Sequence, residues 1–153
     1  MTNPACNVIA ALKGKTLATA ESCTGGGIGA ALTAVSGSSA VFKGGIISYC
    51  NEIKHRLLGV DEAVLEAYGA VSEPVARAMA LGAKKALQTD IAVSVTGLAG
   101  PDGDDYGNPV GTVFIGYADA DNTTVRHFVF VGNREEVRKQ AIDAALRLIL
   151  ENA

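Results

Sequence analysis

Hydrophobic positions along the chain change their period several times, which divides the sequence into strands and helices. Residues 16–20 and 91–95 are short runs of small and β-branched residues, typical of buried strands, and residues 40–49 give a strand rich in Val and Ile. Residues 111–118 and 123–131 are two further strand-like runs joined by a short polar turn. This last pair predicts an antiparallel hairpin.

Helical spacing occupies the intervals between these strands. Apolar residues at i, i+3, i+4 and i+7 predict a helix over 28–35, and an apolar stripe predicts a longer helix that begins at 72–74. Asn133, followed three residues later by Glu136, resembles a capping box and predicts the start of the final helix. Shorter helices are expected at 4–13, at 51–58 with Asn51 as its cap, and at 61–69 with Asp61 as its cap.

Strands that alternate with helices, together with one hairpin, predict a three-layer α/β/α sandwich around a mixed β-sheet. The length suits one compact core, so we expect residues 1–153 to form a single domain. Ligands of such sheets lie beyond the carboxyl ends of the parallel strands. The glycine-rich segments 21–27 and 96–103 and the strand end near Tyr49 fall at that edge, so we expect these three segments to build the site.

The composition argues against several classes of function. With 13 Lys and Arg against 16 Asp and Glu, the net charge of −3 gives no positive surface for nucleic-acid phosphates. Apolar runs are interrupted well before the roughly 20 residues of a bilayer span, and no signal-peptide pattern is present, so we expect a cytoplasmic protein without membrane insertion. Three cysteines without Cys-x-x-Cys spacing and two histidines argue against a disulfide framework, a metal site and a metal cofactor.

A hydrolytic site needs a nucleophile and a base that activates it. We expect both histidines on solvated surfaces, which disfavours a Ser-His-Asp triad. A lysine replaces histidine as the base when burial and neighbouring charges lower its pKa. Lys54 is a candidate because it follows Tyr49 closely, on the segment that leaves the predicted strand 40–49. Ser22 and Cys23 are candidate nucleophiles. The residue types equally allow Ser22 as a helix cap, Cys23 as a small buried residue and Lys54 as a solvated side chain.

The two glycine-rich segments are candidate sites for an anion. Glycine makes up 18 of 153 residues, well above the usual share of about 7%. Gly25 and Gly26 precede a predicted helix, whose first N–H groups suit a phosphate, and Gly97 and Gly100 lie in the second segment. A tight turn without any ligand is the alternative for each segment. Two such segments at one sheet edge favour the binding role.

Five blocks of residues carry a resemblance when they are taken in order. They read Glu-Ser-Cys-Thr-Gly-Gly (21–26), Ser-Tyr-Cys-Asn-Glu-Ile-Lys (48–54), Gly-Ala-Val-Ser-Glu-Pro-Val-Ala (69–76), Thr-Gly-Leu-Ala-Gly-Pro-Asp-Gly (96–103) and Pro-Val-Gly-Thr-Val (109–113). In this order they resemble the motifs of the CinA C-terminal domain family. The likeness extends from about residue 16 to 150 and lacks the larger N-terminal domain of full-length CinA proteins, so it is closest to the single-domain form.

This resemblance implies an enzyme of pyridine-nucleotide salvage that needs no metal. The implied reaction is hydrolysis of the carboxamide of nicotinamide mononucleotide to nicotinate mononucleotide and ammonia. The resemblance implies that Ser22 attacks the amide carbon and that Tyr49 and Lys54 activate it. Lys54 would accept the serine proton directly or through the Tyr49 hydroxyl. We expect backbone N–H groups of the 22–26 turn to stabilise the oxyanion.

The nucleotide phosphate is expected to bind Thr96, Gly97 and Arg134, with Arg138 as the second candidate. The other expected substrate contacts are Thr24, Gly25, Gly26 and Gly100. The sequence departs from the family at Cys50, where a serine is common, and at Asn108, where a basic residue is expected.

Two classes of function without catalysis stay open at this point. The domain could bind a nucleotide without hydrolysing it, or serve as an oligomerisation module. Ammonia release by the pure protein separates the first class from an amidase, and thermal stabilisation by a pyridine nucleotide separates the second. We also expect the chain to form a homo-oligomer, with the small-molecule substrate as its other partner.

Overall fold

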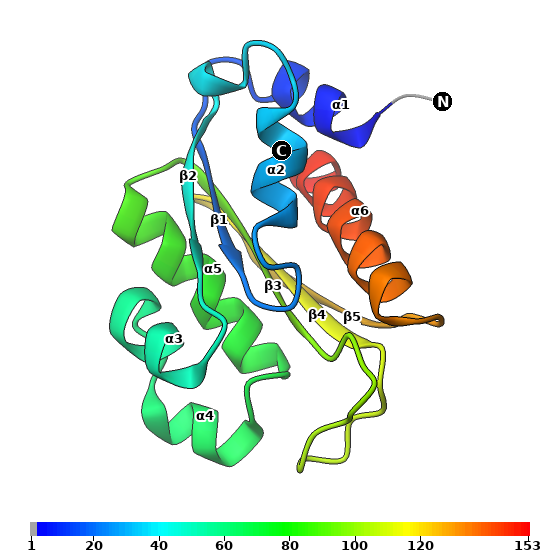
Figure 1. Ribbon diagram of the computed structural model, residues 1–153. Helices are drawn as coiled ribbons and strands as arrows, with labels where there is room; N and C mark the ends of the chain where they lie inside the picture. The colour runs from blue at the N-terminus through cyan, green and yellow to red at the C-terminus, as the bar shows by residue number, and fades with distance from the viewer. Residues whose placement is uncertain (1–2) are drawn as a thin grey trace.

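The computed structural model describes residues 3–153, so residues 1 and 2 of the expected domain lie outside the described part. One sheet of five strands runs in the order β2-β1-β3-β4-β5 (Figure 1). β1 pairs in parallel with β2 and β3, whereas β4 is antiparallel to both β3 and β5, which confirms the predicted mixed sheet. The strands are β1 (Leu17–Glu21), β2 (Phe42–Ile47), β3 (Ile91–Gly97), β4 (Thr112–Ala118) and β5 (Thr123–Val129).

Helices cover both faces of the sheet, as the three-layer prediction requires. α1, α2 and α6 lie on one face, and α3, α4 and α5 lie on the other (Figure 1). None of the helices within residues 3–153 combines the length and the apolar character needed to cross a bilayer. The helices are α1 (Pro4–Ala11), α2 (Gly27–Thr33), α3 (Asn51–Leu58), α4 (Glu62–Tyr68), α5 (Glu73–Leu87) and α6 (Arg134–Asn152), with a short 3₁₀ turn η1 (Ser38–Ala40) before β2.

The hydrophobic core consists of one cluster on each side of the sheet. Side chains alternate between the two faces of a strand, so neighbouring residues of β1 join different clusters. Leu17 packs in the cluster that includes Ile149 of α6, and Ala18 packs in the cluster that includes Met79 of α5. Both faces of β1 are therefore buried. This explains why the strand carries no charged residue before Glu21 and is apolar there except for the buried Thr19.

The segment after β2 departs from its predicted course. The strand ends at Ile47, two residues before the predicted end, and the backbone N–H of Ser48 donates to the carbonyl of Glu21 at 2.7 Å. The chain then leaves the sheet and enters α3. Cys50 is the N-terminal cap of this helix and Asn51 is its first residue, so the prediction that Asn51 caps the helix was wrong.

The other predicted caps are present. Asp61 accepts from the N–H of Ala63 at 2.9 Å at the start of α4, and Asn133 and Glu136 form the reciprocal capping box of α6. α3 is held against α5 by a close approach at Gly82, where a Cβ atom would overlap the carbonyl oxygen of Leu58. These contacts fix the end of α3 and the starts of α4 and α6, and residues of α3 and α6 reach the edge where the parallel strands end.

Candidate active site

A hollow of about 400 Å³ lies at the edge where the three parallel strands end. The segments that follow β1, β2 and β3 line it, together with α3 and the first residue of α6. This is the three-segment arrangement that the sequence predicts. The predicted site residues that line it are Ser22, Tyr49, Lys54, Thr96, Gly97, Gly100 and Arg134.

Ser22 and Lys54 meet directly inside this hollow. Lys54 Nζ lies 3.2 Å from Ser22 Oγ and donates a hydrogen bond to the carbonyl of Ser48 at 2.6 Å. The lysine is only 1% exposed, and the serine is buried too, so the solvated alternative for Lys54 is wrong. Two residues that are 32 positions apart thus form one buried pair.

Burial also sets the charge state of this lysine. Loss of hydration lowers the pKa of Lys54 from its ordinary 10.5 to about 8, despite a smaller opposing effect of Cys50 and Cys23. A neutral amine is then accessible near physiological pH. In that form Nζ accepts a proton from the Ser22 hydroxyl while it still donates to the Ser48 carbonyl. The pair therefore has the geometry and the proton affinity of a nucleophile and its base.

Cys23, the alternative nucleophile, has the opposite electrostatic environment. Burial raises the pKa of its thiol to about 11, so the thiol keeps its proton at neutral pH. A reactive cysteine needs a lowered pKa, so this environment favours Ser22. The backbone of Cys23 is better suited to the chemistry: within residues 3–153 its N–H has no hydrogen-bond partner outside its own residue, whereas the N–H of Ser22 donates to Val95.

Glu21 holds the turn that carries Ser22. Its buried carboxylate accepts from the Thr24 hydroxyl at 2.6 Å, from the N–H of Ile28 at 2.9 Å and from the N–H of Gly29 at 3.0 Å. A carboxylate at this place satisfies N–H groups at the start of α2 and is favoured by the helix dipole. Glu21 is not among the residues that the sequence predicts for the site. The available signal was a charged residue at the end of an otherwise apolar strand, because a buried charge needs partners.

Three predicted substrate contacts lie beside the hollow and do not line it. The hydroxyl of Thr24 is committed to Glu21. Gly25 and Gly26 have φ angles of +57° and +100°, a backbone region that favours glycine, and they form the turn into α2. Their arrangement matches the tight-turn alternative for this segment.

Arg134 and Tyr49 form a second group at the exposed side of the hollow. Arg134 Nη2 donates to the Tyr49 hydroxyl at 3.1 Å, and Nη1 donates to the carbonyl of Gly100 at 2.6 Å. The hydroxyl of Thr96 donates to the carbonyl of Ala70 at 2.8 Å and is thus committed to the protein. Because Lys54 contacts Ser22 directly, a proton needs no relay through Tyr49 to pass between them.

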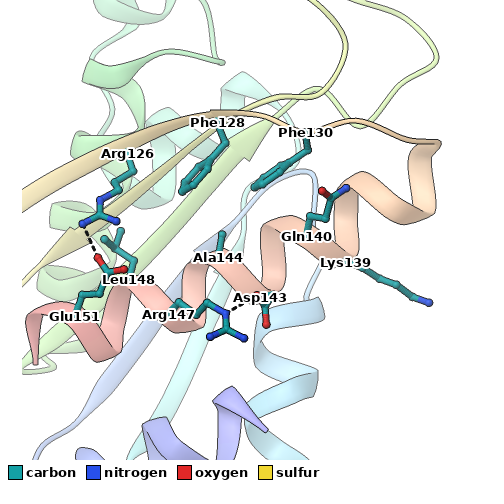
Figure 2. Close-up of a pocket in the computed structure, with 10 residues that line it drawn as sticks. All are labelled: Arg126, Phe128, Phe130, Lys139, Gln140, Asp143, Ala144, Arg147, Leu148 and Glu151. Atoms are coloured by element: carbon teal, nitrogen blue, oxygen red, sulfur yellow. Dashed lines mark hydrogen bonds and ion pairs between the residues drawn. The ribbon is translucent and has the colours of Figure 1, made fainter. Parts of the chain in front are cut away.

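A second hollow, of about 470 Å³, lies between β5 and α6 (Figure 2). Four of its charged side chains pair with one another, Arg126 with Glu151 and Arg147 with Asp143, and Lys139 pairs with Glu135 outside the hollow. Among the residues drawn in Figure 2 there is no serine, cysteine or histidine. The described residues of this hollow therefore offer no serine or cysteine nucleophile and no histidine base.

Neither histidine lines these two hollows, and His55 lines a third one, of about 560 Å³, whose described lining residues include no serine or cysteine. His55 is exposed, with Nδ1 2.8 Å from the carbonyl of Val60 and Nε2 3.0 Å from Glu62, and the exposed His127 stacks on Phe114. Within the described residues, no group of three or more His, Cys, Asp and Glu side chains is placed to hold a metal ion.

The fold and the buried pair define a class: an α/β/α sandwich with a serine and a lysine where its parallel strands end. A model of the CinA C-terminal domain matches residues 3–153, and the chain belongs to this family. Solved structures agree. A CinA superfamily protein from Escherichia coli has a TM-score of 0.93 at 33% identity, covering 99% of this chain and 89% of that one. A competence/damage inducible protein from Agrobacterium tumefaciens has a TM-score of 0.94 at 37% identity, covering 97% and 92%.

Curated relatives fall into two groups by length. The nicotinamide-nucleotide amidohydrolase PncC of Enterobacter agglomerans is 50% identical over 145 residues, which are 92% of this chain and 88% of that protein. The Escherichia coli K12 protein of the same name is 47% identical over 138 residues, or 90% and 84%. A CinA-like protein of Geobacter sp. strain M21 is 54% identical over 125 residues, or 82% and 30%. The chain thus spans about a third of the length of the CinA-like proteins it matches.

Burial of Lys54 predicts a pH-dependent stability. Its folded-state pKa lies below the unfolded value, so burying the protonated amine lowers the free energy of unfolding. This destabilisation is complete below pH 8 and disappears as the pH rises toward 10.5. Replacing Lys54 with Met removes this titration. From pH 7 to 10.5, wild type should gain about 3 kcal/mol of unfolding free energy relative to the variant. Urea denaturation across this range measures it.

The exposed Lys139 on α6 provides the matched control, because Lys139→Met removes a lysine without removing a buried amine. Its stability should follow that of wild type across the same pH range. If the free energy of unfolding changed with pH in the same way for wild type and Lys54→Met, the assignment of a lowered pKa to Lys54 would be wrong.

Proposed function

We propose that this chain hydrolyses the carboxamide of nicotinamide mononucleotide to nicotinate mononucleotide and ammonia, a reaction of pyridine-nucleotide salvage. The observation that carries the proposal is the buried amine of Lys54, 3.2 Å from the hydroxyl of Ser22 in a hollow at the strand ends. Relatives that are about 50% identical over most of this chain bear the name nicotinamide-nucleotide amidohydrolase, which supports the substrate and the reaction.

In the first half of the proposed reaction, neutral Lys54 accepts the hydroxyl proton as Ser22 Oγ bonds to the carboxamide carbon. The backbone N–H of Cys23 donates to the oxyanion. It is the N–H directly after the nucleophile, and an oxyanion donor of this kind commonly contributes about 2.7–4 kcal/mol. The tetrahedral intermediate then breaks its carbon–nitrogen bond. Lys54 returns the proton to the leaving nitrogen, which departs as ammonia and leaves an ester on Ser22.

The second half repeats these steps with water. Lys54 takes a proton from water as the water oxygen bonds to the ester carbon. The ester bond breaks, Ser22 regains its proton from Lys54, and nicotinate mononucleotide leaves. One lysine serves as base and acid in both halves because its pKa of about 8 allows both protonation states near neutral pH.

The exposed side of the hollow is the proposed place of the nucleotide phosphate. Arg134 brings a positive charge to this side, next to Tyr49 and to the segment after β3. A guanidinium suits a phosphate because its donors form a planar fork. In this proposal Thr96 and Gly97 contribute through the backbone, because the Thr96 hydroxyl already binds the carbonyl of Ala70. Tyr49 contacts the substrate beside Arg134.

The direct test is ammonia release from nicotinamide mononucleotide by the pure protein. Ser22→Ala should abolish turnover while binding of the nucleotide, measured by calorimetry, changes only a few-fold, because the lost hydroxyl makes the covalent bond but few contacts before it. Cys23→Ala should remain active, since its thiol stays protonated and its backbone N–H is unchanged. Turnover retained by Ser22→Ala and lost in Cys23→Ala would identify Cys23 as the nucleophile.

The pH profile tests the base. Activity of the wild type should rise with pH and level off above about 8, as Lys54 loses its proton. Lys54→Met should lower kcat by about 10²–10⁴, the usual effect of losing a positioned base. Lys54→Arg should not restore activity, because arginine does not deprotonate in proteins. An active Lys54→Arg enzyme would exclude the lysine as the base.

The phosphate assignment is tested by comparing nicotinamide mononucleotide with nicotinamide riboside, which lacks the phosphate. Arg134→Ala should reduce kcat/KM for the nucleotide by about 10- to 100-fold, the value of one charge-assisted contact, and leave the slower riboside reaction nearly unchanged. Equal losses with the two substrates would show that Arg134 does not act on the phosphate.

A further inference from the structure

Arg138 lies behind the nucleophile turn and has no part in the proposed mechanism. It belongs to α6, one turn after Arg134, and its side chain is partly buried. Its Nε donates to the carbonyl of Cys23 and its Nη2 donates to the carbonyl of Thr24, both at 3.0 Å. The planar guanidinium therefore bridges two successive carbonyls, with a fork geometry that no other side chain reproduces. Arg138 does not line the hollow.

The two bonds act on backbone groups that adjoin the reacting atoms. A peptide unit is planar and trans, so fixing the carbonyl of Cys23 or Thr24 fixes the plane of the unit to which it belongs. Ser22 and the N–H of Cys23 come directly before these units. On the other side of the turn, Glu21 holds the Thr24 hydroxyl at 2.6 Å. The turn is thus held from two sides by charged groups of opposite sign.

We propose that Arg138 is a positioning residue for the nucleophile. It keeps Ser22 Oγ in line with Lys54 and keeps the N–H of Cys23 turned toward the oxyanion, although it touches neither the substrate nor Lys54. A small displacement of a reacting group costs up to about 10² in rate, so the loss of the two bonds should be visible in kcat. The proposal rests on the proposed amidase mechanism, and it replaces the expectation that Arg138 is a second phosphate ligand.

The test compares Arg138→Met and Arg138→Lys with wild type on nicotinamide mononucleotide and nicotinamide riboside. Arg138→Met should lower kcat by about 10- to 100-fold with both substrates alike, with KM changed less than about threefold. Arg138→Lys should fall between it and wild type, because one ammonium group does not span both carbonyls. The midpoint of the pH profile should stay near 8, since burial is the main cause of the lowered pKa of Lys54 and Arg138 is not among its causes.

Arg147→Met is the matched control. Arg147 lies on the same helix, is exposed and pairs with Asp143, so its loss should leave both reactions and the pH profile unchanged. A rate loss confined to the nucleotide would make Arg138 a phosphate ligand and overturn the proposal. An unchanged kcat in Arg138→Met would overturn it too.

Two further measurements separate this proposal from simple unfolding and from failure of the amidase mechanism. If Arg138→Met does not fold, the kcat of the folded Arg138→Lys variant is compared with that of wild type instead. Full activity in Arg138→Lys would then refute the proposal. If wild type releases no ammonia, the amidase proposal fails. Acylation of Ser22 by p-nitrophenyl acetate, followed by mass spectrometry, then tests positioning: it should be about tenfold slower in Arg138→Lys. Equal acylation rates, or no acylation in wild type, would overturn the proposal.

Discussion

Burial of one amine beside one hydroxyl is the physical constraint on which the whole site depends. Lys54 loses its hydration almost completely, and the protein compensates with two oxygen partners, Ser22 Oγ and the carbonyl of Ser48. Because hydration favours the charged form, its loss lowers the pKa to about 8. The same desolvation that makes the amine a usable base costs folding energy below that pH. The surrounding α/β framework must supply the difference.

The framework offsets the free-energy cost of burying Lys54 by holding both Lys54 and Ser22 through contacts between residues that are distant in sequence. α3 carries Lys54, and Leu58 at the end of this helix packs closely against Gly82 of α5, which fixes α3 on the layer that covers the sheet. The serine lies on a turn fixed by the carboxylate of Glu21 and by the guanidinium of Arg138. Charged groups are used here as structural supports for backbone. Both are bonded to several partners, as a charge removed from water requires.

Much of the fold and part of the site follow from the sequence. Period-two and helical patterns are local properties, so the strands, most helices and the capping box at Asn133 could be predicted, and the hairpin predicted the mixed sheet. Parallel strands end at one edge, which placed Ser22 and Tyr49 near each other. Exact element ends were less predictable. β2 ends at Ile47, two residues before the predicted end, although the N–H of Ser48 still bonds to the carbonyl of Glu21, and no local pattern marks this end.

The sequence by itself determined the elements, the mixed sheet and, through its motifs, most of the residues that meet at the edge where the parallel strands end. Only the tertiary structure decided what each residue does. Burial decided between a solvated and a buried Lys54 with a lowered pKa, and between a thiolate and a protonated thiol at Cys23. Long-range bonds committed the Thr24 hydroxyl to Glu21 and joined Arg134 to Tyr49, 85 positions away. Desolvation and hydrogen bonding depend on what surrounds a group in space, and neighbours in space are not neighbours in sequence.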